Sequence, residues 1–461
     1  MNPIQTHGIL FETLQRLKIF ADGKTLVDCE LKTDPETIEA EFSALLTEFA
    51  NKHFAPPNDQ TKIPAAQPNL KAHIDSLWAL LERKASAPAT GSSLLALPEP
   101  FIVPGGRFNE LYYWDSYFSA LGLRLAGRMD LVLGIAKNFS SLIARFGFIP
   151  NGSRSYFLTR SQPPFFVCLL ELIATDLGLA AIQPFLPSLE REYAFWMQPD
   201  RILAPGLHRY WGTPNTPREE SYVEDFLLGE AHPELPNFYA DRRAGAESGW
   251  DFSSRWNGIP TDPSTIRTTQ IAPIDLNCLL YQLELKLGQW LGNTDYTKAA
   301  QARKKIILER LWDETAGWFF DFNVNGTHTQ SWHLGAVFPL FFGIASQQQA
   351  EVLAANLEQK FLYGGGLITT LHFGDEQWDA PNGWAPLQWL AVRGLERYGF
   401  MELATKIRGR FTSHAEKVWQ QTGKLMEKYD VVNLERLAGG GEYPAQDGFG
   451  WTNGVLRDFL E

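Results

Sequence analysis

Residues 104–145 read PGGRFNELYYWDSYFSALGLRLAGRMDLVLGIAKNFSSLIAR, and this stretch contains the unit from which we infer the fold. A loop rich in Gly and aromatic residues comes first, and the spacing of apolar residues then predicts helices over 114–127 and 129–145. A tight turn near Gly127 separates the two helices. A long loop, a helix, a tight turn and a second helix form a helical hairpin whose long loop lies at one end.

The same unit recurs along the chain. Helical spacing also predicts helices over 36–50, 69–83, 164–178, 182–197, 274–291, 297–312, 347–359, 386–398, 400–419 and 451–460. Long loops fall at 95–113, 147–163, 198–225, 244–272, 362–385 and 422–450, and loops of this length in a compact protein are usually functional. Strand-like alternation is sparse and short. We therefore expect an all-α fold, an (α/α) barrel made of a ring of helical hairpins with long active-site loops at one end.

The composition narrows the class of protein. The chain has 461 residues, 44% of them hydrophobic and 20% charged, which is typical of a globular protein with a large core. No Ser- or Gly-rich linker interrupts it, so we expect a single domain over 1–461. The net charge of -12 argues against nucleic-acid binding.

The N-terminus and the hydropathy pattern bear on location. The first residues, MNPIQTHGILFETLQRLKIF, lack the pattern of a secretory signal peptide. No apolar run reaches the roughly 18 residues of a membrane span. We therefore expect a cytoplasmic protein without membrane contact, and a monomer.

Cysteine and histidine usage does not predict a metal site. Cys29, Cys168 and Cys278 are far apart and form no CxxC pair, so we expect three reduced and mostly buried thiols. The nine histidines show no HxxxH or HxH spacing. We expect neither a metal nor a cofactor.

The loop at 104–117 is the first that suggests chemistry. Its Pro-Gly-Gly turn lets the backbone approach a ligand closely. Arg107, Glu110, Trp114 and Asp115 then bring charge and an aromatic face together. The alternative is a helix entry with a structural Arg–Asp pair.

The loop at 150–164, PNGSRSYFLTRSQPP, offers hydrogen-bond donors. Asn151, Arg160 and Gln162 carry amide and guanidinium groups that suit vicinal hydroxyls. Loops of this composition are also common without any ligand.

The loop at 214–224, PNTPREESYVE, contains the charge run Arg218, Glu219 and Glu220. Such a run is usually a solvated face, and that interpretation stays open.

Residues 245–257, GAESGWDFSSRWN, place Asp251 between Trp250 and Phe252. Apolar neighbours raise the pKa of a carboxyl because desolvation disfavours its charged form. A general acid that works near neutral pH requires such a pKa. The alternative role for Asp251 is a helix N-cap.

Residues 377–386, QWDAPNGWAP, contain Trp378, Asp379 and Trp384. Tryptophans in a Pro/Gly loop suit stacking on the CH faces of a sugar, although they are also common core residues.

Residues 423–453, GKLMEKYDVVNLERLAGGGEYPAQDGFGWTN, contain the acidic residues Glu427, Asp430, Glu442 and Asp447 around the glycine run 439–441. A glycine run can serve as the hinge of a closing lid. The alternative is an ordinary flexible loop.

Together these segments resemble the trehalases, glycoside hydrolase family 37. PGGRFNELYYWDSY and QWDAPNGWAP are similar to the two signature motifs of that family over their whole length. KTLVDCELK, NGSRSYFLTRSQPPFF, PREESY, AESGWDFSSRW, EKYD and GGGEYPAQDGFGWTNGV also resemble trehalase segments in the expected order. The likeness extends from about residue 10 to 456.

The resemblance implies an (α/α)6 barrel and hydrolysis of α,α-trehalose to two glucose molecules with inversion at the anomeric carbon. It makes Asp251 the general acid and Glu427 the general base. It also implies a set of sugar-binding residues, namely Arg107, Phe108, Trp114, Asp115, Asn151, Arg160, Ser161, Gln162, Arg218, Glu219, Glu220, Gly249, Trp378 and Glu442.

Inversion sets an expectation for the geometry, because a water must fit between the base and the sugar. The two carboxyl groups of an inverting pair lie about 6.5–9.5 Å apart. Trehalose is neutral, so we expect the arginines to donate paired hydrogen bonds to hydroxyls and to keep carboxylates such as Glu427 ionised.

Other functions stay open at this point. One is another (α/α)-barrel glycosidase of glucoamylase type, and a second is a catalytically inactive trehalose-binding protein. A phosphorolytic enzyme would need a phosphate site, and the chain has no Gly-rich P-loop.

Overall fold

A closed ring of helices forms the centre of the computed structural model, which describes residues 8–35, 37–38, 42, 46–56, 67–85, 87–89, 91–436, 444 and 446–461. Each helix of this inner ring packs against the next, and the last packs against the first. In order, the ring members are α6 (Tyr113–Leu125), α8 (Phe166–Leu177), α12 (Ile274–Leu291), α14 (Phe338–Phe341), α16 (Ala385–Arg397) and α18 (Gly450–Phe459).

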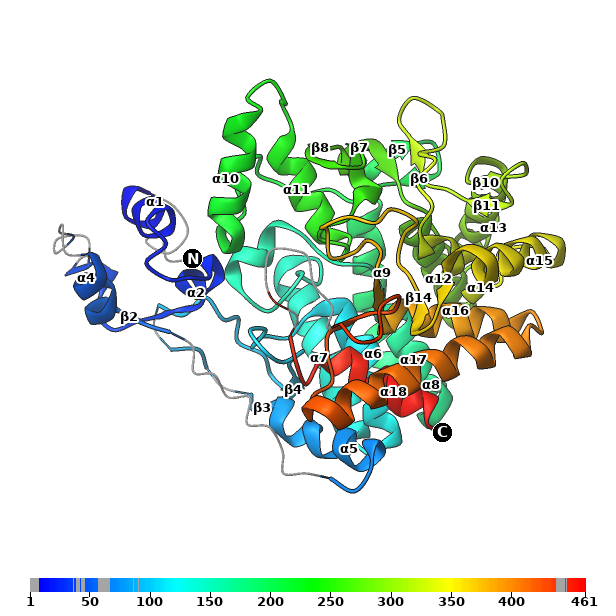
Figure 1. The fold of residues 1–461 in the computed structure, drawn as a ribbon, viewed down its shortest axis with the longest axis horizontal. Coiled ribbons are helices and arrows are strands. Elements are labelled where there is room, and N and C mark those ends of the chain that lie inside the picture. Colours follow the sequence, from blue (N-terminus) through cyan, green and yellow to red (C-terminus); the bar gives the residue numbers. More distant parts are fainter. Residues whose placement is uncertain are drawn as a thin grey trace.

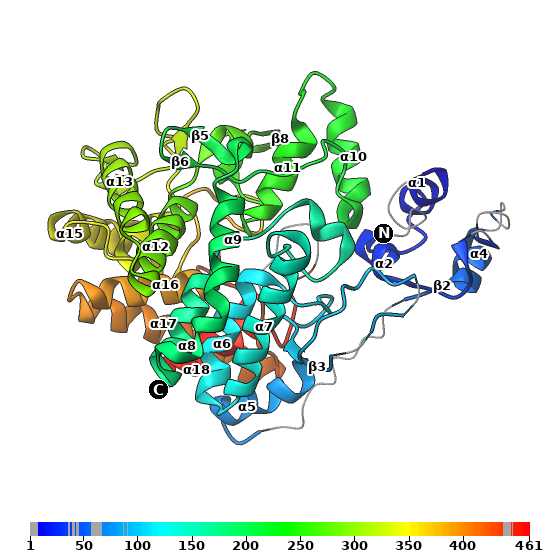
Figure 2. The same ribbon diagram turned by 180° about the vertical axis from the view of Figure 1, so that it is seen from behind.

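A second layer of helices surrounds the ring (Figures 1 and 2). In the described part of the chain this layer consists of α5 (Leu70–Leu81), α7 (Met129–Phe146), α9 (Leu186–Trp196), α13 (Thr294–Arg310), α15 (Gln347–Asn356) and α17 (Met401–Thr422). The outer helix α7 packs on α6 and α8, α13 packs on α12, and α17 packs on α16. The predicted all-α fold is confirmed, and the architecture is an (α/α)6 barrel.

The sequence determines which helices are inside. The inner helix α6 is buried without interruption from Tyr113 to Leu123, so no face of it needs polar residues. The outer helix α13 buries only Ala300, Arg303 and Ile307 and presents most of its other charged residues to solvent. The inner helix is thus buried on all sides, whereas the outer helix buries a single stripe.

The ring closes where α18 meets α6, and glycines permit the close approach. A Cβ atom added to Gly454 would collide with the carbonyl oxygen of Phe118. A Cβ added to Gly122 would lie 2.8 Å from the Cα of Gly454. Side chains at these positions would therefore push the first and last inner helices apart.

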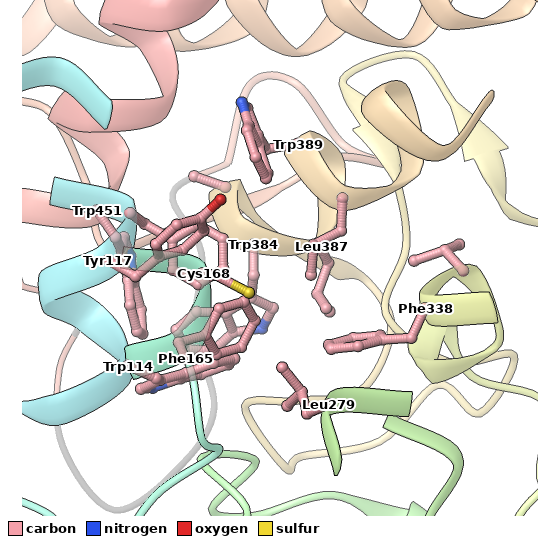
Figure 3. Packing of buried hydrophobic residues seen from close by; sticks show 14 of the residues in the cluster. Trp114, Tyr117, Phe165, Cys168, Leu279, Phe338, Trp384, Leu387, Trp389 and Trp451 are labelled. Atoms are coloured by element: carbon pink, nitrogen blue, oxygen red, sulfur yellow. The ribbon is translucent and has the colours of Figure 1, made fainter. Parts of the chain in front are cut away.

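Aromatic side chains fill the space inside the ring (Figure 3). The labelled residues include Trp114 and Tyr117 from α6, Trp389 from α16 and Trp451 from α18, so elements far apart in sequence share one core. Truncation of a buried aromatic residue to alanine typically costs about 3–5 kcal/mol, and this cluster therefore contributes strongly to stability.

Strands are short, as the sequence predicts. The described residues form two-stranded antiparallel sheets only. The pairs are β1 (Glu30–Leu31) with β2 (Phe54–Ala55), β3 (Glu82–Arg83) with β4 (Phe101–Ile102), β5 (Ile202–Ala204) with β6 (Leu207–His208), β7 (Asn257–Ile259) with β8 (Asp262–Ile266), β9 (Ile271–Ala272) with β12 (Phe322–Asn323), β10 (Trp312–Asp313) with β11 (Trp318–Phe319), β13 (Leu362–Tyr363) with β14 (Gly366–Leu367), and β15 (Asn382–Trp384) with β16 (Lys428–Asp430).

Five of the described α-helices were not predicted, namely α1 (Ile9–Arg16), α2 (Gly23–Asp28), α10 (Tyr222–Ala231), α11 (Phe238–Glu247) and the short ring member α14. The helices α10 and α11 lie between α9 and α12. The sequence of α11, FYADRRAGAE, is buried nearly throughout although four of its ten residues are charged, so it shows no apolar stripe. The predicted helix over 36–50 falls partly outside the described residues, and the helix described there is α4 (Leu46–His53).

An N-terminal segment lies at one side of the barrel (Figures 1 and 2). It contains α1 (Ile9–Arg16), α2 (Gly23–Asp28) and α4, which have an apolar cluster of their own. Buried ion pairs fix it to the barrel. Lys24 lies 2.8 Å from Glu110, and Arg154 lies 3.1 Å from Asp28 and 2.7 Å from Glu110.

The buried side chain of Glu192 in α9 makes the free energy of unfolding depend on pH. The side chain is fully buried and accepts a hydrogen bond from the Tyr113 hydroxyl, and burial raises its pKa from the ordinary 4.5 to about 8. Because the folded pKa is the higher one, the proton stabilises the fold fully below pH 4.5, and this contribution is lost as the pH rises to about 8.

We therefore expect Glu192→Gln, which mimics the protonated form, to reduce the loss of stability between pH 5 and pH 8. Urea unfolding at several pH values measures this slope. Glu190→Gln is the matched control on the same helix, and equal slopes in the Glu192 variant and the unmodified protein would contradict the assignment.

One smaller expectation is confirmed by the structure. Cys29, Cys168 and Cys278 are free and buried, as predicted. Within the residues that the structure describes, no helix has the length and apolar character needed to cross a bilayer.

Candidate active site

A cavity opens where the chain enters the inner helices. The space between its walls, including the open mouth, is about 670 Å³. Its walls come from the loops that precede α6, α8, α16 and α18, from α2 and from the segment that follows α11. The predicted gathering of long loops at one end of the barrel thus forms the site.

Most of the predicted site residues line this cavity. They are Arg107, Phe108, Trp114, Asp115, Asn151, Arg160, Gln162, Arg218, Glu220, Gly249, Asp251, Trp378 and Glu427. Glu442 and the glycine run 439–441, with the predicted lid hinge, lie outside the described residues.

Two predicted contacts, Ser161 and Glu219, are not among the lining residues. The backbone N–H of Ser161 donates to Glu247 at 2.8 Å, and its hydroxyl donates to the carbonyl of Ile149 at 2.6 Å. Glu219 accepts a hydrogen bond from Arg243 at 3.1 Å. Both residues support the wall from behind.

Four carboxyl groups line the cavity, those of Asp115, Glu220, Asp251 and Glu427, and three of them influence one another. Asp251 is half-buried, whereas Asp115 and Glu427 are buried. Burial raises the pKa of Asp115 well above its ordinary value, a backbone N–H opposes this rise, and the negative charges of Glu427 and Asp251 add to it. Asp115 is thus close enough to sense both of these carboxyl groups.

The loop that carries Asp251 is fixed by Asp379. The Asp379 carboxylate accepts hydrogen bonds from the Ser253 hydroxyl at 2.8 Å, from the Ser254 N–H at 3.0 Å and from the Thr370 hydroxyl at 3.0 Å. The predicted sugar-binding motif at 377–386 therefore supplies a buried anchor. Asp379 itself is fully buried.

Gly249 lets this loop pack against the wall of the cavity. Its φ is +75°, and an added Cβ would lie 2.8 Å from the Trp114 ring. Any side chain at this position would displace Trp114 or the loop that carries Asp251.

Glu427 is held by its neighbours on both sides. Its N–H donates to the carbonyl of Gln446 at 2.9 Å, and its carbonyl accepts from the Trp451 indole N–H at 3.0 Å. The Lys428 ammonium lies 3.2 Å from the Glu427 carboxylate, with both side chains buried. We expected arginines to keep this carboxylate ionised, and the structure shows that a lysine also contacts it.

The cavity arginines pair with other carboxylates. Arg107 lies 2.7 Å from Asp22, and Arg160 lies 2.5 Å from Glu220. Arg160 is buried, and its Nε and Nη1 have no hydrogen-bond partner among the described residues; the same holds for Oε2 of Glu220. A buried guanidinium with unmet donors needs an acceptor, and a bound ligand could supply it.

Charge balance keeps Glu220 ionised. Burial would raise its pKa, but the positive charges of Arg160, Arg218 and Arg243 outweigh burial, and the pKa lies below its ordinary value. Arg218 is itself held by two hydrogen bonds of 2.8 Å to Asp225. The charge run at 218–220 is therefore folded into the site and is not a solvated face.

The tryptophans of the site stack mainly on one another. The rings of Trp378 and Trp384 are parallel, with centroids 3.8 Å apart, and Trp250 stacks on Trp378 at 5.4 Å. Trp451 meets Trp384 edge-on at 5.6 Å. The group forms a rigid aromatic wall, and stacking on a sugar remains a prediction.

A comparison with protein families bears on this geometry. The family described as Trehalase matches residues 18–461. A periplasmic trehalase from Salmonella schwarzengrund is 43% identical over 98% of this chain and 85% of its own length. One from Salmonella paratyphi C is 42% identical over the same shares.

The chain belongs to the trehalase family. Among solved structures, the neutral trehalase from Saccharomyces cerevisiae has a TM-score of 0.70 at 24% identity and covers 97% of this chain and 93% of its own. A GH63 mannosylglycerate hydrolase from Thermus thermophilus has a TM-score of 0.59 at 19% identity, over 84% of this chain and 99% of its own. At these identities the likeness concerns the fold alone, and it agrees with the (α/α)6 barrel of this trehalase.

The expected cytoplasmic location is wrong for this trehalase. The curated relatives that match nearly the whole chain are named periplasmic trehalases. The expectation rested on the composition of the first residues, and composition there does not report the compartment of the folded protein.

Sequence reasoning missed several residues in the cavity of this trehalase. Lys24, Tyr112, Phe157, Phe449 and Trp451 also line it. All five stand in segments that resemble trehalase segments, but none was assigned to the site. Trp384, which the 377–386 motif offered for stacking on a sugar, lines the cavity as well.

Proposed function

We propose that this member of the trehalase family hydrolyses α,α-trehalose to two glucose molecules in one displacement with inversion. The observation that supports the proposal most is that Asp251 and Glu427, from distant segments, line one cavity. The cavity also presents the unmet donors of Arg160, which match the hydroxyl-rich and uncharged substrate.

The mechanism divides the work between two carboxyl groups. Asp251, protonated, donates its proton to the glycosidic oxygen as the bond from that oxygen to the anomeric carbon breaks. Glu427, ionised, takes a proton from the water that attacks the same carbon from the opposite face. One glucose leaves as the α-anomer and the other is formed as the β-anomer, and proton exchange with solvent restores both carboxyl groups.

Burial suits the two roles. The Lys428 ammonium lies 3.2 Å from the carboxylate of Glu427, the proposed base. Asp251 is half-buried between the buried rings of Trp250 and Phe252. Asp115, whose pKa is raised by burial, is proposed to donate a hydrogen bond to a substrate hydroxyl in its protonated form.

Further properties extend the proposal. We propose a periplasmic location by analogy with the named relatives. We also propose one domain over 1–461, because the apolar cluster of the N-terminal segment includes Tyr112 and Phe157 from barrel loops. A monomer without a cofactor stays a prediction.

Proton NMR with resolved anomers tests the function. Fresh enzyme with trehalose is expected to release α- and β-glucose in equal initial amounts, because one glucose leaves with its configuration retained and the other is inverted. Maltose serves as the control substrate and separates this activity from that of a glucoamylase-type enzyme. Two α-glucose molecules per trehalose, or faster cleavage of maltose, would refute the proposal.

Arg160→Lys tests the role of the guanidinium. The substitution keeps the charge beside Glu220 but removes the planar set of donors, so kcat/KM for trehalose is expected to fall about 10²-fold. Steady-state kinetics measure the loss. Arg191→Lys, in the exposed part of α9, is the control, and near-normal turnover of the Arg160 variant would contradict the role.

A further inference from the structure

A hydrogen-bonded chain joins the loop of Asp251 to the carboxylate of Glu427. The Nε2 of Gln377 donates to the carbonyl oxygen of Asp251 at 2.5 Å. The Oε1 of Gln377 accepts from the Lys428 ammonium at 2.9 Å. The same ammonium donates to Oε2 of Glu427 at 3.2 Å. Gln377 and Lys428 are therefore the two links between the proposed acid and the proposed base.

The backbone around this chain of hydrogen bonds is held by a pair of β-strands and by side-chain hydrogen bonds. In the pairing of β15 with β16, Trp384 lies opposite Lys428. The carbonyl of Gln377 accepts from the Trp384 indole N–H and from the Asn382 side-chain amide, each at 3.1 Å. Gln377 and Lys428 are 1% and 0% exposed, so water does not compete for their hydrogen bonds.

The residue types match the order of donors and acceptors in this chain of hydrogen bonds. An ammonium only donates, so both oxygens that Lys428 meets must accept, and the one on Glu427 accepts best when the carboxylate is ionised. The Gln377 amide accepts on one side and donates on the other, so it can join a lysine to a backbone carbonyl. A carboxylate in place of Gln377 could not donate to the Asp251 carbonyl.

We propose that Gln377 and Lys428 are positioning residues that set the distance and orientation of the Glu427 carboxylate relative to the loop of Asp251. Neither residue is among those that line the cavity. The pair acts as one unit because the amide of Gln377 transmits the position of the Asp251 loop to Lys428, and Lys428 transmits it to Glu427. The proposal rests on the proposed function and deepens it.

The main test is a double-mutant cycle with Gln377→Met, Lys428→Met and the double variant. Misplacement of a catalytic group by about 1 Å costs roughly 10²-fold in rate. We expect each single variant to lose about 10²-fold in kcat on trehalose, with KM changed less than about threefold. If the two residues form one unit, the double variant is no slower than the slower single variant.

A conservative variant separates position from charge. Lys428→Arg keeps a cation that can donate to both acceptors, and we expect it to recover part of the kcat that Lys428→Met loses.

A second substrate tests whether the loss lies with the base. Glucosyl fluoride with the α-configuration needs the base but little help from an acid, because fluoride leaves without a proton. Lys428→Met is expected to lose a similar factor on this substrate.

Gln388→Met controls for a purely structural effect. Gln388 is buried like Gln377, but its amide binds only the backbone of Leu367, with two bonds of 2.8 Å. We expect the thermal midpoint of the Gln388→Met variant to fall while its kcat stays within a factor of about two of the normal value. Lys424→Met is the control for lysine, since Lys424 is part-exposed and pairs with Asp447 at 3.0 Å.

Several results would refute the proposal that Gln377 and Lys428 act as one positioning unit. Multiplicative losses in the double variant would show that the two residues act separately. Equal changes in kcat and KM, or losses that follow the thermal midpoint in the Gln388 variant as well, would assign both residues to general stability. If Lys428→Met does not fold, Gln377→Met and Lys428→Arg still decide the point. Failure of the unmodified protein to cleave trehalose would instead refute the proposed function.

Discussion

Glu427→Ala is expected to lower kcat on trehalose by about 10³-fold, the middle of the range for the loss of one acid–base group. The variant lacks a group to take the proton from the attacking water. KM is expected to change little, since the other lining residues of the cavity remain. Stopped assays with long incubation measure the residual rate, and α-glucosyl fluoride is expected to show the same loss because its hydrolysis also needs the base.

The control for Glu427→Ala is Glu435→Gln, on an exposed glutamate that pairs with Lys417. It is expected to behave like the unmodified protein. The Glu427 variant leaves Lys428 buried beside a lost partner, so its thermal midpoint is measured in parallel. A folded Glu427→Ala variant with more than about a tenth of the normal kcat would remove Glu427 from the role of base.

Asp251→Ala, in contrast, is expected to lose much more activity on trehalose than on α-glucosyl fluoride. On trehalose kcat falls by about 10³-fold, because the departing glucose oxygen is a poor leaving group without a proton. On α-glucosyl fluoride the loss is expected to be less than about tenfold, since fluoride leaves as an anion. The ratio of the two activities therefore identifies the acid and separates it from the base.

The matched control is Asp375→Asn, on an exposed aspartate of the 362–385 loop. It is expected to leave both activities unchanged. If Asp251→Ala loses the two activities to the same extent while it remains folded, Asp251 is not the proton donor.

The helices of the barrel were predictable where apolar residues recur at helical spacing, in the inner and the outer layer alike. The predicted bounds of 274–291 coincide with those of α12, and α7 differs from its prediction by one residue. The helix α11 escaped prediction because charged residues such as Arg242 and Arg243 lie inside the protein, where partners from other elements satisfy them. Apolar periodicity reports burial only when polar groups are outside.

The candidate site was predictable to a similar degree. Motifs pointed to Asp251 and Glu427, and the fold brings these residues to one cavity. The supporting layer was not predictable, because it depends on pairing between distant segments. Lys428 stands next to the predicted base in sequence, but only the hydrogen bond between the two side chains in the folded protein shows that it meets Gln377.

The closure of the ring by α18 has a consequence for the assembly of the site. Trp451 in the first turn of α18 lines the cavity and binds the carbonyl of Glu427. The reaction centre therefore cannot assemble before α18 has docked on α6. A chain that already contains both Asp251 and Glu427 but lacks α18 is expected to be inactive.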